Sequence, residues 1–185
     1  MKKLNYEMLK DILYRFPNNN IKNLNIYNKS SNNKILFDPA GKYYILKCKG
    51  KRSYIWFTYY EKKMLAILIL LNGKNIDDKC NDFYELMIEF DNTLCYNNVL
   101  LYGYYFKNKI NNYFIIENVY NFNILNHIIE NKNYKKVYKN KLEIFSKILP
   151  LIKTNSNFYI KLPLILENSD SIFKKIYNLD YKIYS

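Results

Sequence analysis

The stretch that decides the fold is VLLYGYYFKNKINNYFIIENVY, residues 99–120. Its two halves, 99–106 and 113–120, carry apolar side chains at alternating positions, and six residues, 107–112, separate them. Period-two alternation on both sides of a short polar turn predicts an antiparallel β-hairpin, because successive residues of a strand point to opposite faces of a sheet. We therefore expect an antiparallel sheet around this hairpin.

The rest of the chain alternates strand patterns with helix patterns. Strands are expected at 43–46, 53–60, 64–71 and 158–166, and helices at 4–16, 121–131, 135–149 and 171–177. The first helix is expected to stop before Pro17, and the segment 82–90 fits either type of element. With no repeat and no linker, the 185 residues predict one α+β domain, 1–185, whose antiparallel sheet has flanking helices.

The chain is strongly basic and aromatic. It has 29 Lys and Arg against 16 Asp and Glu, a formal net charge of +13, and 18% aromatic residues. Such a balance is typical of proteins that bind nucleic acid, and the aromatic rings would supply stacking surfaces for bases. The same composition, rich in Asn, Lys, Ile, Tyr and Phe, would also follow from an AT-rich genome, so the charge has two explanations of equal weight.

Several classes of protein are excluded. The longest apolar stretch, 64–71, is too short to cross a membrane, and the N-terminus lacks the hydrophobic region of a signal peptide, so we expect an intracellular protein. Three distant cysteines and a single histidine suggest neither a disulfide framework nor a zinc site. We expect no metal site and no cofactor.

A basic segment, KCKGKRSY at residues 47–54, carries the clearest candidate chemistry. A glycine between cations lets a phosphate approach the backbone while lysines neutralise it. The alternative is an ordinary charged hairpin turn between two strands. The only tryptophan, Trp56, follows, and we expect it to stack on a base together with Tyr54 or Tyr59, unless it anchors the core.

These residues resemble a known arrangement. Lys47-x-x-Gly50-x-Arg52-x-Tyr54 is similar to the first motif of the capping-enzyme and ATP-ligase nucleotidyltransferases, and the stretches 100–105 and 113–119 resemble two later strands of that family. The resemblance covers about residues 36–125 and implies a nucleotidyltransferase-type core over about 36–185. It also implies Lys47 as the catalytic nucleophile. The nucleotide- or RNA-binding residues that we expect are Lys49, Gly50, Lys51, Arg52, Tyr54, Trp56, Tyr102, Tyr104 and Glu117.

The departures from the family indicate lost catalysis. Lys49, Tyr102 and Tyr104 stand where the family has carboxylates for ribose and metal. The run Gly50-Lys51-Arg52 and the stretch 113–119 are similar to those of the snurportin-type cap-binding domain, which resembles the same core without its catalytic residues. We expect an inactive, cytoplasmic protein of a large DNA virus that binds RNA, an RNA cap or a nucleotide, or that serves as a subunit of a viral assembly in the viral factory or virion, without membrane insertion. One alternative is an active covalent guanylyltransferase or RNA ligase completed by a partner chain. The other is a structural virion component.

Overall fold

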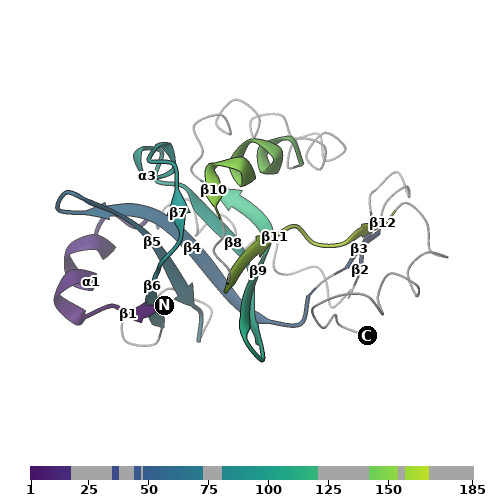
Figure 1. Ribbon diagram of the computed structural model, residues 1–185, viewed down its shortest axis with the longest axis horizontal. Helices are drawn as coiled ribbons and strands as arrows, with labels where there is room; N and C mark the ends of the chain where they lie inside the picture. Colours follow the sequence, from purple (N-terminus) through teal and green to yellow (C-terminus); the bar gives the residue numbers. More distant parts are fainter. Residues whose placement is uncertain are drawn as a thin grey trace.

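The computed structural model of the protein describes residues 1–17, 35–37, 44–46, 48–72, 81–120, 142–153 and 157–166. These residues form a mixed α+β structure with a mostly antiparallel sheet that curls around its apolar contacts (Figure 1). The expected α+β class with an antiparallel sheet is confirmed at this level. No helix within the described ranges is both long and apolar enough to cross a membrane.

Seven strands form the main sheet, in the order β1-β6-β5-β4-β8-β9-β11. Their bounds are β1 Lys2–Lys3, β4 Lys51–Tyr60, β5 Lys63–Leu70, β6 Asp82–Leu86, β8 Leu100–Asn108, β9 Asn111–Tyr120 and β11 Phe158–Lys161. Neighbouring strands are antiparallel except β11, which pairs with β9 in parallel. The hairpin expected at 99–120 is confirmed as β8 and β9, which place Tyr104 opposite Ile115.

The first helix is also confirmed, as α1, Tyr6–Leu13. It begins at Asn5, whose side-chain oxygen accepts a hydrogen bond of 2.9 Å from the backbone N–H of Met8. Such a cap satisfies one of the backbone donors that the first turn leaves without an intrahelical partner. Of the helix expected at 135–149, residues 142–148 are helical, while the helices expected at 121–131 and 171–177 lie outside the described residues.

The interpretation of the basic segment as a hairpin turn is wrong. Strand β3 (Tyr44–Leu46) pairs with β2 (Ile35–Phe37) and β12 (Ile165–Leu166) in a second sheet. Strand β4 already has β5 on one side and β8 on the other, so it has no edge left for β3. The basic segment therefore links two sheets (Figure 1), and the strand expected at 158–166 is divided between them as β11 and β12.

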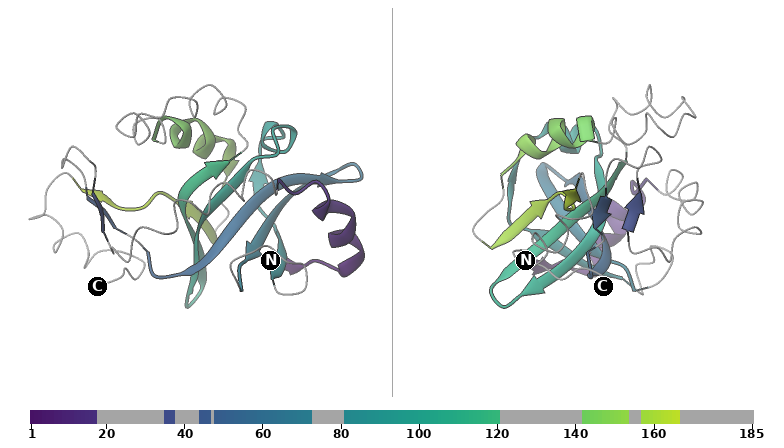
Figure 2. Two further views of the ribbon diagram at one scale, coloured as in Figure 1. Left: turned by 180° about the vertical axis from the view of Figure 1, so that it is seen from behind. Right: turned by 90° about the vertical axis from the view of Figure 1, so that its right-hand side faces the viewer.

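Both faces of the main sheet carry an apolar core. Along β4, Ile55 and Phe57 belong to the cluster on one face, and Tyr54 and Trp56 belong to the cluster on the other. The first face packs against helix 142–148 and the short helix α3 (Thr93–Tyr96), and the second packs against α1 (Figure 2). Full burial of a large apolar side chain stabilises a fold by about 1.5–3 kcal/mol, so strands covered on both faces hold the sheet together.

The remaining described elements close the first face. Strand β7 (Glu89–Phe90) pairs with β10 (Ile152–Lys153) in a two-stranded sheet, and the 3-10 helix η3 (Leu149–Leu151) precedes β10. The segment 82–90, which fitted either type of element, consists of two strands, β6 and β7. The second face is the one that positions the candidate site.

Candidate nucleic-acid interface

Strand register brings four of the expected binding residues together on the α1 side of the sheet. In the β4–β8 pair, Arg52 lies opposite Tyr104, and Tyr54 lies opposite Tyr102. The ring centroids of Tyr54 and Tyr102 are 5.1 Å apart, and those of Tyr102 and Tyr104 are 6.4 Å apart. Two neighbouring strands therefore present a continuous row of tyrosines with an arginine beside it.

A β-bulge adds Glu117 to the same face. Tyr102 pairs with Asn118 and Gly103 pairs with Ile116, so Glu117 has no partner residue in β8. Ile116 and Val119 both belong to the cluster on the other face, which leaves the two residues between them on the α1 side. The Asn118 side chain donates a hydrogen bond of 2.9 Å to the Tyr120 hydroxyl there.

The bulge depends on a glycine in the facing strand. A Cβ atom at Gly103 would lie 2.0 Å from the carbonyl oxygen of Ile115, far inside van der Waals contact. No other residue type fits that position without moving β9. Glycine in a strand interior often marks such a close approach of two backbones.

The hydroxyls of Tyr54, Tyr102 and Tyr120 are protonated at neutral pH. Burial raises the pKa of Tyr102 to about 12, with a smaller contribution from the Glu117 carboxylate, while the Arg52 guanidinium and a hydrogen bond with Tyr104 oppose the rise. Burial also raises the pKa values of Tyr54 and Tyr120. These hydroxyls donate and accept hydrogen bonds but do not act as bases.

The aromatic row continues across three strands toward β11. The rings of Phe106 and Tyr113 stack at 5.2 Å with an interplanar angle of 6°, and those of Tyr113 and Tyr159 stack at 5.3 Å with an angle of 23°. The ammonium of Lys161 lies 5.5 Å from the centroids of both Tyr113 and Tyr159. Tyr113 is buried, whereas Phe106, Tyr159 and Lys161 are half-buried.

We call this surface the tyrosine face. It comprises Arg52, Tyr54, Tyr102, Tyr104, Phe106, Tyr113, Glu117, Tyr159 and Lys161. On its β4–β6 side, α1 covers the sheet through Leu9, Ile12 and Phe16. The β8–β9–β11 side carries the half-buried rings and the ammonium group.

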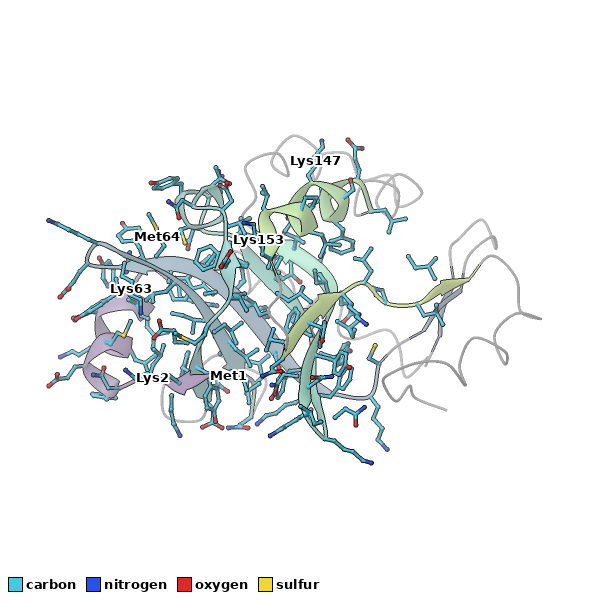
Figure 3. All side chains as sticks on the ribbon, in the orientation of Figure 1. Met1, Lys2, Lys63, Met64, Lys147 and Lys153 are labelled. Atoms are coloured by element: carbon cyan, nitrogen blue, oxygen red, sulfur yellow. The ribbon has the colours of Figure 1, made fainter. Side chains whose placement is uncertain are left out.

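Five exposed cations gather where β4 begins and the β8–β9 hairpin turns. This group, the basic end, comprises Lys49, Lys51, Arg52, Lys107 and Lys109. Its members come together because Lys51 pairs with Tyr105, two residues before Lys107. The described residues form four ion pairs, between Lys3 and Asp82, Lys63 and Glu85, Lys147 and Glu143, and Lys153 and Glu89, and none of them uses a cation of the basic end. Lys63, at the α1 side of the sheet, lies away from this end (Figure 3).

The expected stacking role of Trp56 is wrong. Its side chain is 0% exposed, its ring lies edge-on to Phe16 at 5.0 Å, and its Nε1–H donates a hydrogen bond of 2.5 Å to Asn98. The alternative prediction, that Trp56 anchors the core, is confirmed. No base reaches this ring, because both the sheet and α1 enclose it.

The backbone of Gly50 lies close to that of β8. A Cβ at Gly50 would lie 2.8 Å from the carbonyl oxygen of Tyr105, so a residue with a side chain at this position would disturb the contact between the two backbones. Lys47, the expected nucleophile, lies outside the described residues. The other expected binding residues lie on the two named surfaces. Lys49 and Lys51 lie at the basic end, Arg52 belongs to both surfaces, and Tyr54, Tyr102, Tyr104 and Glu117 lie on the tyrosine face.

Sequence patterns missed part of the site. Tyr102 and Tyr104 are expected from the resemblance. Phe106 and Tyr113 lie on the same face of the hairpin, and its alternation would have indicated them. Tyr159 and Lys161 had no such signal, because their place depends on the parallel pairing of β11 with β9. Among the residues that the structure describes, no three histidine, cysteine or carboxylate side chains are grouped as metal ligands.

Comparison with protein-family models, with curated proteins and with solved structures finds no match to this chain. Its function is therefore argued from the tyrosine face and the basic end.

Proposed function

We propose that this protein binds single-stranded RNA on the tyrosine face and does not transfer nucleotides. The observation that carries the proposal is the junction of two surfaces: half-buried aromatic rings on β8 and β11 share a face of the sheet with Arg52, which is one of five exposed cations that make no ion pair with the described carboxylates. Unpaired bases stack on aromatic side chains, each stack contributing about 1–3 kcal/mol, and lysines neutralise the phosphates.

The arrangement assigns a role to each group. The basic end takes the phosphates, and the rings of Tyr104, Phe106 and Tyr159 take the bases. Protonated tyrosine hydroxyls offer hydrogen bonds to base edges or to ribose 2′-hydroxyl groups, which RNA has and DNA lacks. A duplex hides its base faces, so a site built on ring stacking favours single strands.

A nucleotidyltransferase-type core remains our proposal for the architecture. Its support is that the three stretches resembling that family's motifs lie on adjacent strands, β4, β8 and β9. Within such a core, Tyr102 and Tyr104 replace carboxylates, and the protonated Tyr102 hydroxyl carries no negative charge to hold a metal ion. Binding without catalysis follows from this chemistry.

A labelling experiment tests the lack of catalysis. Incubation with radiolabelled ATP or GTP and magnesium is expected to leave the protein unlabelled after denaturation. A stable adduct that Lys47→Ala abolishes would refute the proposal and favour an enzyme completed by a partner chain.

A titration in different salt concentrations tests RNA binding. We expect a fluorescent 12-nucleotide RNA to bind with an affinity that falls about 300-fold between 50 and 200 mM salt, if about six phosphates are contacted. The variant Lys49→Gln/Lys51→Gln/Lys107→Gln is expected to bind more weakly and to reduce the slope of log affinity against log salt by about 2. The control variant Lys2→Gln/Lys10→Gln/Lys62→Gln removes the same charge from exposed positions that do not belong to the basic end.

The two variants separate a specific surface from net charge. Equal losses of affinity would assign binding to the overall +13 rather than to the basic end. Absence of binding at 50 mM salt would refute the proposed function and leave the AT-rich genome as the explanation of the charge.

A further inference from the structure

Glu117 is a carboxylate on a face that is otherwise cationic or neutral. It is half-buried, and its charge acts on the hydroxyls of Tyr102 and Tyr120, which locates the carboxylate on the tyrosine face. It takes part in none of the four ion pairs between described residues. A bulge that turns one carboxylate toward a binding surface is a common device near functional sites.

The strand order places Glu117 and Arg52 on opposite sides of the tyrosine row. Tyr102 and Tyr104 lie on β8, with Arg52 on β4 to one side and Glu117 on β9 to the other. Adjacent strands are about 4.8 Å apart, so the two flanking backbones are about 10 Å apart. One base resting on the Tyr104 ring therefore has the Arg52 guanidinium as a donor on its β4 side and the Glu117 carboxylate as an acceptor on its β9 side.

A carboxylate only accepts hydrogen bonds, so it distinguishes bases by their donors. Cytosine, adenine and guanine each carry an exocyclic amino group with two N–H donors, whereas uracil has only the N3–H donor, which lies between two carbonyl oxygens that a carboxylate repels. We propose that Glu117 makes the tyrosine face select bases with an exocyclic amino group and reject uracil. This inference rests on the proposed function, since it concerns the same surface.

The test compares two RNAs that differ only at the base. Oligocytidine and oligouridine of 12 nucleotides have the same length and phosphate charge, so their phosphate contacts are equal. We expect the wild-type protein to bind oligocytidine about tenfold more tightly, the effect of one hydrogen bond to a charged acceptor. An oligonucleotide of N4,N4-dimethylcytidine, which has lost both amino hydrogens, is expected to bind like oligouridine.

Variants of the protein assign the preference to the carboxylate. Glu117→Gln is expected to weaken oligocytidine binding and to strengthen oligouridine binding, so that the ratio falls to about one, because an amide both donates and accepts. The control Glu89→Gln, at an exposed residue paired with Lys153 at 3.6 Å on β10, is expected to keep the tenfold ratio. If Glu117 had a role in folding alone, Glu117→Gln would lower the affinity for oligocytidine and for oligouridine by the same factor.

Each outcome decides the matter. Equal binding of the two RNAs by the wild-type protein would overturn the inference and leave RNA binding intact, whereas binding of neither would overturn the proposed function as well. A tenfold ratio that survives in Glu117→Gln would assign the selectivity to another residue and also overturn the inference. If Glu117→Gln fails to fold, the dimethylcytidine RNA decides with the wild-type protein, and its binding as tightly as oligocytidine would refute the role of the amino group.

Discussion

Gly103→Ala tests the geometry on which the tyrosine face depends. The new Cβ would lie 2.0 Å from the Ile115 carbonyl oxygen, 2.9 Å from the Ile115 carbonyl carbon and 3.1 Å from a ring carbon of Phe114. The two nearest atoms belong to the backbone of the paired strand, so no side-chain rotation relieves the overlap. Strands β8 and β9 must separate beside the bulge.

The magnitude follows from two opposing effects. Overpacking costs about 1–3 kcal/mol, and a clash with backbone belongs at the upper end of that range. Replacing glycine by alanine also restricts the unfolded chain, which returns about 0.4–1 kcal/mol. We expect the free energy of unfolding to fall by about 2 kcal/mol and the melting temperature to fall by about 4–8 °C.

Urea denaturation followed by circular dichroism measures the change, with Gly50→Ala as the matched control. At Gly50 the nearest contact, to the Tyr105 carbonyl oxygen, is 2.8 Å, so we expect a smaller loss. The displaced bulge is also expected to reduce the preference for oligocytidine. A loss below about 0.5 kcal/mol for Gly103→Ala would refute the close approach of β8 and β9 and, with it, the position assigned to Glu117.

Three further predictions concern the core and the titrating groups. Trp56→Phe removes the hydrogen bond to Asn98 and part of a buried ring. It is expected to lower the free energy of unfolding by about 1–3 kcal/mol in urea titrations and to leave the RNA affinity at 20 °C unchanged. Weaker RNA binding by a variant of unchanged stability would support the stacking role. Burial raises the pKa of Cys95 from 9.0 to about 11, so the folded state holds the thiol proton more tightly. The wild-type protein is therefore expected to melt at a higher temperature than Cys95→Ala below pH 9, and this difference is expected to shrink between pH 9 and 11. A difference in melting temperature that does not depend on pH would contradict this. Hydrogen bonds from the hydroxyl and the backbone N–H of Thr93 lower the pKa of Asp91 below 3.8. The wild-type protein is therefore expected to melt at a higher temperature than Asp91→Ala at pH 7, and this difference is expected to disappear as the pH falls through the lowered pKa. A difference that persists at pH 2 would show that the stabilisation does not depend on the charge of Asp91.

The elements with strong local patterns were predictable. The spacing of Leu9, Ile12 and Phe16 and the stop at Pro17 predicted the first helix, which the structure places at Tyr6–Leu13. Strands β4, β5, β8 and β9 were predictable because aromatic and branched residues fill both of their faces. The tyrosines of β8 belonged to the expected binding set because the stretch 100–105 resembles a strand of the nucleotidyltransferases.

Features set by pairing between distant segments were not predictable. The β3 pattern is that of an ordinary strand, and nothing in it indicates that β3 avoids β4 and joins β2 and β12. Trp56 lies in a strand with large side chains on both faces, so alternation gave no sign of which residues face a ligand. The bulge left one trace, the three-residue spacing of the buried pair Ile116 and Val119, which breaks the period of two.

The pairing of β1 with β6 sets an order of events during synthesis. Lys2 and Lys3 lie opposite Glu85 and Tyr84, so β1 emerges from the ribosome about 80 residues ahead of the strand that pairs with it. At about 5–20 residues per second, β1 waits for about 4–16 s before its partner is synthesised. Hairpins β4–β5 and β8–β9, whose partners are adjacent in sequence, form without such a delay. Strand β1 therefore joins the edge of the main sheet only after β4, β5 and β6 have been synthesised.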